Sequence, residues 1–161
     1  MPKLFAANRV PDAVKSKNME IIEAENHRES IIELLSAKKL PVGDLPAKLE
    51  NFLIARDEKK IAGVAGLEIY GDYGLLRSVA VGNDFRNKGI AGKLLMQIEV
   101  LAASKGLREI YLLTETAPDY FDRKEYKRIA RAEVPAEVQQ SSEFSHVCPQ
   151  SAIVMKKILI K

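Results

Sequence analysis

A glycine-rich turn in the middle of the chain is the feature whose residue types and spacing could do chemistry. Residues 75–81 (LLRSVAV) form an apolar run that predicts a buried strand, and residues 86–95 (RNKGIAGKLL) predict a turn that opens a long amphipathic helix. Backbone N–H groups at a helix N-terminus lack intrahelical partners and lie at the positive end of the helix dipole, so they bind anions. Arg86 and Lys88 add positive charge beside them. We therefore predict a site for a phosphorylated cofactor.

The spacing of the glycines favours one type of cofactor loop. Gly82, Gly89 and Gly92 fit neither the G-x-G-x-x-G pattern of dinucleotide-binding folds nor the G-x-x-x-x-G-K-[ST] pattern of nucleotide-triphosphate loops. Arg86-x-x-Gly89-x-Ala91 instead resembles the acyl-CoA pyrophosphate loop, R/Q-x-x-G-x-G/A, of the GNAT family of N-acetyltransferases. The loop also lies where that family places it, after a strand that ends in Val-Ala-Val and before a long helix. The resemblance implies acetyl-CoA as the co-substrate.

This resemblance implies contacts along the whole cofactor. The main chain of Val79 and Val81 would pair with the pantetheine arm as an added strand would. The backbone amides of the loop would surround the pyrophosphate, and the loop residues are Arg86, Asn87, Lys88, Gly89, Ile90, Ala91 and Gly92. A strand and a helix packed without a ligand would explain the apolar residues, but not three closely spaced glycines and two cations at one helix start.

Residues 114–121 (TETAPDYF) lie where the family usually carries N-x-x-A-x-x-F-Y. Thr114 then stands at the Asn position that bonds the pantetheine. Phe121 takes the place of the family's Tyr, which often protonates the leaving thiolate. The resemblance also implies that Phe121 belongs to the cofactor-binding residues. Tyr120 is one position early, and one residue turns a helical side chain by about 100°. Tyr120 is therefore either a general acid or a packing residue, and water is the other proton source because coenzyme A thiolate is a tolerable leaving group.

Arg77 lies inside an otherwise apolar strand, where an unpaired charge is costly. If it faces an acceptor cleft, its planar guanidinium suits a substrate carboxylate, with Ser78 and Glu115 as further acceptor-binding candidates. The alternative is an internal salt bridge to Glu68 or Glu115. Glu68 is also the candidate general base, directly or through water. A solvated glutamate at the end of a strand is the more ordinary interpretation of Glu68.

Cys148 precedes a proline and lies two residues from His146. A catalytic cysteine needs a nearby base, so the pair suggests a nucleophile. Direct transfer in a ternary complex needs no covalent acyl-enzyme, and we therefore favour a buried or rim thiol.

Two groups within the family share further segments with this chain. Residues 111–121, together with LRSVAV, are similar to the acetyltransferase domain of N-acetylglutamate synthases. The Val-Pro, Ser-Glu-Phe and Cys-Pro-Gln-Ser-Ala segments within residues 134–152 resemble the arsenic-resistance N-acetyltransferases. Both resemblances imply a small amino acid or amino-acid-like amine that carries a carboxylate. Glu125, where the family usually has Gly before an aromatic residue, departs from both groups.

The composition is that of an ordinary globular domain. The chain has 161 residues, of which 47% are hydrophobic and 29% charged, and one cysteine excludes an internal disulfide framework. No Cys/His cluster has metal-ligand spacing. No apolar run is as long as a membrane span, which needs about 18 residues, and none forms the core of a signal peptide. The net charge of +3 lies in residues 1–18, so the body is neutral. We expect a cytoplasmic protein that binds neither nucleic acid nor membranes.

The periodicity predicts one domain, residues 19–161, after a loosely attached leader, residues 1–18. The resemblance implies the GNAT fold for it, an α/β (α+β) domain with a mixed, mostly antiparallel sheet of six to seven strands. Strands 75–81 and 109–113 form its central parallel pair, flanked by helices, because a helix connects them. Strands are also expected at 19–24, 51–56, 60–70 and 151–160. Asn26 and Thr116 are expected to cap helices, and a short second helix is expected after the break at 41–46.

These features support three hypotheses of function. The leading one is an N-acetyltransferase that acts on a small-molecule amine by direct transfer in a ternary complex, as a monomer or a homodimer. A protein acetyltransferase would need an open peptide groove. A non-catalytic acyl-CoA sensor is consistent with Phe121 at the usual Tyr position.

Overall fold

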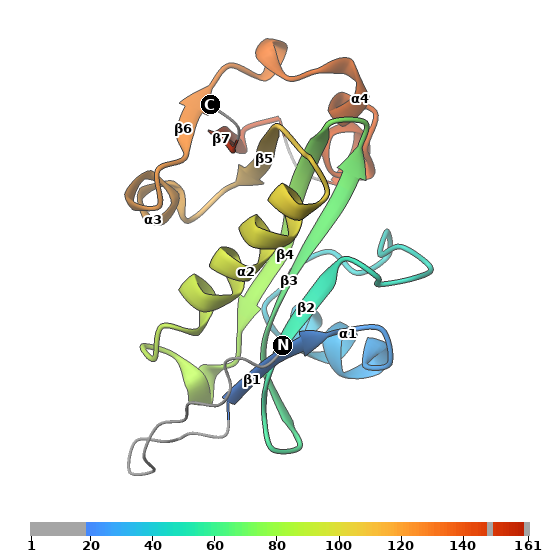
Figure 1. Cartoon of the computed structure of the whole chain (residues 1–161), viewed down its shortest axis with the longest axis vertical. Helices are drawn as coiled ribbons and strands as arrows, with labels where there is room; N and C mark the ends of the chain where they lie inside the picture. Colours follow the sequence, from blue (N-terminus) through green and yellow to red (C-terminus); the bar gives the residue numbers. More distant parts are fainter. Residues whose placement is uncertain (1–18, 148–149, 160–161) are drawn as a thin grey trace.

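A seven-stranded sheet runs through the part of the chain that the structure describes, in the order β1-β2-β3-β4-β5-β7-β6 (Figure 1). The computed structural model describes residues 19–147 and 150–159. Its strands are β1 (Met19–Glu23), β2 (Phe52–Asp57), β3 (Lys60–Tyr70), β4 (Tyr73–Val81), β5 (Glu109–Thr114), β6 (Lys127–Ile129) and β7 (Ile153–Ile158). Among these strands only β4 and β5 pair in parallel, and helix α2 (Ile90–Ser104) connects them. The predicted mixed sheet with one central parallel pair is therefore confirmed.

Helices cover both faces of this sheet. Besides α2, the described residues form the helices α1 (Arg28–Ala37), α3 (Pro118–Arg123) and α4 (Ala136–Gln139). They also form the 3-10 turns η2 (Asn83–Phe85) and η3 (Arg131–Glu133) and the π-helical turn η4 (Glu143–Val147). Figure 1 shows α2 lying across β3 and β4. Successive residues of a strand face opposite sides, and Ala55 of β2 packs in the cluster that contains α2 whereas Ile54 packs with α1. Helices α1 and α2 therefore lie on opposite faces.

The apolar core is continuous on the α2 face and divided on the other. On the α2 face, residues such as Leu76 and Leu94 belong to one large cluster. On the opposite face, one cluster packs around α1 and includes Ala80, and a second packs around α4 and η4 and includes Leu75. Strand β4 passes from the second cluster to the first, so the seam between them crosses β4.

Two predicted helix caps are wrong. Helix α1 begins after His27, and no side chain caps it, so Asn26 is not its N-cap. Helix α3 begins after Ala117 instead of Thr116. The Thr114 hydroxyl instead fixes this start, because Oγ1 accepts a hydrogen bond from the Ala117 amide at 3.0 Å. Ser, Thr and Asn all satisfy the capping signal, and the sequence does not show which one leaves the helical conformation.

The expected second helix is absent, and residues 38–51 form turns and bends. Pro41, Gly43 and Pro46 all disfavour a helix in this segment. The Pro46 carbonyl also accepts a hydrogen bond of 2.6 Å from Arg28 Nη1, although a helix would use that oxygen for its own backbone. This segment is therefore a loop held by side chains.

The turn after α3 contains a non-glycine residue in the left-handed region. Glu125 has φ of 73°, and its amide donates to the Asp122 carbonyl at 3.1 Å. The Tyr126 amide donates to the Phe121 carbonyl at 3.0 Å. Glycine is the usual residue at such a helix end, and the family resemblance places it here. The departure at Glu125 thus keeps the turn and adds backbone strain.

We expect Glu125→Gly to raise the free energy of unfolding by about 1 kcal/mol, because it removes the Cβ that crowds a left-handed residue. Urea denaturation measures this gain as a higher midpoint at constant slope. Glu125→Ala is the matched control, since it removes the same carboxylate but keeps the Cβ. Equal gains in both variants would assign the effect to the charge and contradict the strain argument.

Candidate functional site

Strands β4 and β5 are paired at one end and separate at the other. Their parallel register begins at Tyr73↔Glu109 and ends at Leu75↔Tyr111, with no further pair in the described residues. Over residues 76–81, the β4 edge that faces β5 therefore offers backbone N–H and C=O groups without a strand partner from β5. An extended ligand can pair with such an edge as an added strand would.

A bulge in β4 lies where the two strands separate. Gly66 of β3 pairs with Arg77, but Val64 pairs with Ala80, so β4 carries one extra residue between these pairs. Ser78, inside the bulge, has φ of 59°, which is uncommon for a residue with a side chain. Bulges bend a strand and redirect its side chains, and they recur beside active sites.

This bulge changes the face that each later β4 residue uses. Before it, Leu75 packs on the α4 side of the sheet and Leu76 packs with α2. After it, Val79 and Val81 pack on the α2 side, and Ala80 packs with α1. Simple alternation would have placed Val79 on the same face as Leu75. The two valines predicted to contact the pantetheine therefore share a face with α2.

The turn before α2 has the backbone geometry of an open anion-binding loop. Asn87 (φ 64°) and Gly89 (φ 75°) are both left-handed, and Gly89 is the N-cap of α2. A Cβ on Gly89 would meet no heavy atom of the described residues within 4 Å, and Arg86 and Lys88 are exposed. The N–H groups of residues 90–92 have no intrahelical acceptor. The predicted turn and helix start are confirmed, whereas a bound pyrophosphate stays a prediction.

Two side chains from the end of α3 lie against the first turn of α2. A Cβ on Gly92 would lie 3.4 Å from Lys124 Nζ and 3.7 Å from the Tyr120 hydroxyl. This hydroxyl is buried and has no hydrogen-bond partner in the described residues. Burial raises the pKa of Tyr120, so the hydroxyl is protonated at neutral pH. Lys124 was not among the predicted residues, although its i,i+4 spacing from Tyr120 places both on one helix face.

Phe121 points into the core beside Tyr120. Its ring makes edge-to-face contacts with Tyr120 and Tyr126, with centroids 5.2 and 5.6 Å apart. The one-residue shift between Tyr120 and the family's Tyr position thus points the two side chains in different directions. The Tyr120 hydroxyl reaches the first turn of α2, whereas Phe121 is buried in the apolar cluster on the α2 face. Thr114 keeps a hydroxyl proton for a ligand while its oxygen accepts from the Ala117 amide.

Arg77 is the hub of a buried ion cluster on the face opposite α2. Nη1 and Nη2 donate to the two Asp44 oxygens at 2.8 and 2.9 Å, and Nη1 also donates to Glu68 at 2.9 Å. Nη2 lies 3.8 Å from the Glu143 carboxylate, and Nε donates to Ser78 Oγ at 3.0 Å. Burial alone would lower the pKa of Arg77. The Asp44 hydrogen bond and the charges of Glu143 and Glu68 outweigh burial and raise that pKa.

The geometry distinguishes the two interpretations of Arg77. The predicted salt bridge to Glu68 is present, whereas Glu115, the other predicted partner, is exposed and outside the cluster. The Arg77 side chain is 0% exposed, and four of its five N–H groups donate hydrogen bonds to Asp44, Glu68 and Ser78. The remaining N–H group, on Nη2, lies beside the Glu143 carboxylate at 3.8 Å, so Arg77 offers an acceptor carboxylate at most this one buried donor unless Asp44 is displaced.

Glu68, the candidate general base, is held at both carboxylate oxygens. Oε1 accepts a hydrogen bond from the Tyr70 hydroxyl at 2.6 Å, and Oε2 accepts one from Arg77 Nη1 at 2.9 Å. The side chain is 13% exposed, so the expectation of a solvated strand-end glutamate is wrong. Burial and the hydrogen bond to Glu68 raise the pKa of Tyr70, which keeps Tyr70 the donor. Each Glu68 oxygen retains a second lone pair for a proton or water.

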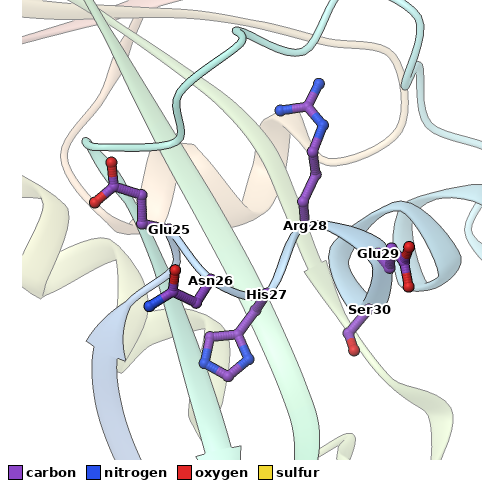
Figure 2. Close-up of a pocket in the computed structure, with 6 residues that line it drawn as sticks. All are labelled: Glu25, Asn26, His27, Arg28, Glu29 and Ser30. Atoms are coloured by element: carbon purple, nitrogen blue, oxygen red, sulfur yellow. The ribbon is translucent and has the colours of Figure 1, made fainter.

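A polar hollow of about 320 Å³ lies at the start of α1 and is lined by one continuous segment, residues 25–30 (Figure 2). None of these residues was predicted to belong to a site. Figure 2 shows Arg28 extending from this segment on the side opposite His27. Arg28 donates to the carbonyls of Pro46 at 2.6 Å and Leu45 at 3.4 Å. Arg28 therefore anchors the loop that carries Asp44.

Two negative findings concern only the described part of the chain. It contains no group of three or more His, Cys, Asp and Glu side chains that could hold a metal ion. It also contains no helix long and apolar enough to cross a membrane. Cys148, the candidate nucleophile, and the predicted leader, residues 1–18, lie outside the described residues.

Comparison with known sequences gives two matches. A family model described as the acetyltransferase (GNAT) family matches residues 18–129. A protein of Chlorobaculum tepidum named as an uncharacterized N-acetyltransferase is 28% identical over 101 residues, which are 62% of this chain and 64% of that protein. This chain thus spans less than two thirds of that relative.

Solved structures share the fold at low sequence identity. The N-acetylglutamate synthase from Neisseria gonorrhoeae, complexed with coenzyme A and N-acetyl-glutamate, has a TM-score of 0.74 and 16% identity, over 91% of this chain and 36% of that one. A GNAT-family acetyltransferase from Staphylococcus aureus has a TM-score of 0.70 and 23% identity, over 88% and 99% of the two chains. The PaiA N-acetyltransferase from Thermoplasma acidophilum, in complex with coenzyme A, has a TM-score of 0.64 and 17% identity, over 88% and 99%.

Proposed function

Since this chain belongs to the acetyltransferase (GNAT) family, we propose that it transfers the acetyl group of acetyl-CoA to the amine of a small, amino-acid-like acceptor in a ternary complex. The observation that carries this proposal is the separation of β4 from β5 beside the open turn before α2. One connection, residues 82–89, joins a strand edge that suits an extended arm to a helix start that suits a pyrophosphate. Fold neighbours crystallised with coenzyme A support acetyl-CoA as the co-substrate.

The cofactor-binding groups of this proposal lie on the α2 side. The amides of residues 86–92 hold the pyrophosphate, and Lys88 and Lys124 supply positive charge beside it. The main chain of Val79 and Val81 pairs with the pantetheine along the free edge of β4. These contacts orient the thioester toward the bulge at Ser78. Arg77 and Glu68 lie beside this bulge, on the face of the sheet opposite α2.

The chemistry is a direct transfer. The neutral amine nitrogen bonds to the thioester carbonyl carbon and the C–S bond breaks. The nitrogen loses one proton as the amide forms, and this loss balances the proton that the thiolate takes up. Glu68 accepts the proton that the ammonium group of the acceptor must lose, directly or through a water molecule. Tyr120, which burial keeps protonated, donates to the thiolate, and water is the alternative donor.

The acceptor is the least constrained part of the proposal. A small amino-acid-like acceptor is supported by the N-acetylglutamate synthase neighbour, which was crystallised with coenzyme A and N-acetyl-glutamate, and by the resemblance to arsenic-resistance N-acetyltransferases. Because Arg77 is buried and four of its five donors are taken, we assign any carboxylate of the acceptor to other groups. Arsenic resistance, a cytoplasmic location and a homodimer stay predictions from the sequence.

We expect acetyl-CoA to raise the melting temperature of the protein, whereas NAD and ATP leave it unchanged. A ligand that binds only the native state adds about 2.7 kcal/mol of stability at a hundredfold excess over its Kd. Thermal unfolding at millimolar ligand measures the shift. An unchanged melting temperature with acetyl-CoA would contradict the assigned co-substrate.

A thiol-release assay on the same protein then tests the transfer itself. Turnover with members of an amino-acid panel supports the proposed acceptor class. Turnover with lysine peptides alone would indicate a protein acetyltransferase. Binding of acetyl-CoA without thiol release from any acceptor would indicate an acyl-CoA sensor, which Phe121 at the usual Tyr position favours.

We expect Gly89→Val to weaken acetyl-CoA binding by on the order of a hundredfold, about 2.7 kcal/mol, because a branched side chain blocks the approach of phosphate to the backbone amides. Gly106→Val is the matched control. Gly106 lies after the other end of α2 with φ of 76°, against 75° for Gly89, and a Cβ at either position would meet no described atom within 4 Å. Both variants therefore carry similar backbone strain, and only Gly89→Val should lose binding in calorimetry.

Lys88→Ala completes that comparison. Lys88 is exposed, so its charge is screened and the variant should lose no more than about fivefold in affinity, about 1 kcal/mol. If Lys88→Ala abolished binding while Gly89→Val retained it, backbone amides would not be the main anion-binding groups.

We expect Tyr120→Phe to lower kcat while the ligand-free protein keeps or gains stability. The hydroxyl has no partner in the described residues, and an unsatisfied buried polar group costs about 1–3 kcal/mol. Tyr126→Phe is the control, since the Tyr126 hydroxyl donates to Glu99 at 3.0 Å and its loss should lower stability. Unchanged kcat in Tyr120→Phe would make Tyr120 a packing residue and leave water as the proton donor.

A further inference from the structure

Arg77 occupies the seam between the two core clusters on the face opposite α2. Its neighbours along β4 belong to different clusters, because Leu75 packs around α4 and η4 while Ala80 packs around α1. In the part of the chain that the structure describes, these two clusters have no residue in common. The Arg77 side chain is nevertheless fully buried, because it is enclosed by polar groups.

Those polar groups come from separate segments of the chain. Asp44 belongs to the loop between α1 and β2, Glu68 to β3, and Glu143 to the turn η4. Neither the Asp44 loop nor η4 belongs to the sheet, so neither is held by strand pairing. The carboxylates Asp44, Glu68 and Glu143 all lie within 4 Å of one guanidinium, and their side chains are only 12%, 13% and 7% exposed.

The same loop is held on a second side by Arg28, whose guanidinium donates to the Pro46 carbonyl at 2.6 Å. The two arginines differ in what they fix. Arg28 holds loop backbone to the start of α1, whereas Arg77 joins the loop to β3, β4 and η4 at once. Of these two arginines, Arg77 is therefore the one that couples the position of Glu68 to the positions of both segments.

We propose that Arg77 is a positioning residue that acts from inside the protein, holding the Glu68 carboxylate, the Asp44 loop and η4 in one arrangement around the bulge of β4. It does so without touching the acceptor, since its side chain is fully buried and four of its five N–H groups donate to protein oxygens. The inference rests on the proposed function only for the role of Glu68 as the base. The fixing of the two segments stands on the geometry alone.

Hydrogen exchange of the ligand-free full chain tests the geometric part. Arg77→Met should speed amide exchange by at least about tenfold in residues 40–50 and 142–145, while amides of α2 exchange as before. Arg56→Met on strand β2, which pairs with the far side of β3, is the matched control, because in the described part of the chain Arg56 forms its salt bridge with Glu20 and both side chains are substantially exposed. Unchanged exchange in both segments of Arg77→Met would overturn the proposal.

A second variant covers the case in which Arg77→Met does not fold. Asp44→Ala removes the loop's own link to Arg77 but leaves Glu68 and Glu143 beside the guanidinium. Exchange should then rise in residues 40–50 and stay unchanged in 142–145. Equal protection of residues 40–50 in Asp44→Ala and the parent protein would show that Arg77 does not hold the loop.

Kinetics test whether Arg77 acts through Glu68. Arg77→Lys, which keeps the charge but loses the planar fork, should lower kcat/KM for the acceptor by about tenfold and leave the acetyl-CoA KM within about twofold. In a Glu68→Gln background the same change should lower kcat no further, because the base through which it acts is gone. Effects that multiply would show that Arg77 contacts the acceptor itself. A parent protein that acetylates no amine would refute the proposed function, and the exchange result would still decide the positioning role.

Discussion

The separation of β4 from β5 is the constraint on which the rest of the site depends. Two parallel strands that stay bonded over their first three residue pairs and then diverge leave a strand edge with unpaired donors and acceptors. Such groups are costly to bury without partners, so the edge needs water or an extended ligand. The bulge at Ser78 makes this divergence compatible with a packed sheet, because it lets Val79 and Val81 face α2 while Ala80 returns to α1. The gap between β4 and β5 beyond Leu75 (hereafter the slot) and the helix start at Gly89 therefore come from one strand–turn–helix unit.

The buried Arg77 cluster is the counterpart of this slot on the opposite face. Replacing a buried ion cluster with apolar residues of similar volume is often neutral or stabilising, so stability alone does not explain Arg77. An apolar residue at this place would join the α1 cluster to the α4 cluster and close the seam that crosses β4. The guanidinium keeps the two clusters apart and fixes the directions of Asp44, Glu68 and Glu143. The Arg77 guanidinium therefore contributes to the specific arrangement of these carboxylates more than to the free energy of unfolding.

The sequence predicts features that depend on residues close together in the chain and misses those that depend on residues far apart. The sheet, its parallel pair and the turn before α2 were predictable because periodicity and glycine spacing are local signals. The bulge was not predictable, because residues 75–81 place apolar side chains on both faces of the strand and show no change of alternation. Asp44 was missed as a partner of Arg77 because it lies 33 residues away in a loop with no pattern of its own. Strand β6, with three residues, is too short for alternation to show.

Two unsatisfied features on the α2 face have one common explanation. The free edge of β4 lacks a strand partner over residues 76–81, and the Tyr120 hydroxyl is buried without a hydrogen bond in the described residues. Folded proteins leave few buried polar groups unpaired, and those that persist concentrate at functional sites. The hydroxyl lies beside the first turn of α2, where a Cβ on Gly92 would lie 3.7 Å from it, and the turn before α2 directly follows β4 in the chain. A single extended ligand that enters between β4 and β5, as in the proposed function, would give both a partner, and the exchange of Tyr and Phe at positions 120 and 121 would then keep a hydroxyl, that of Tyr120, next to this ligand.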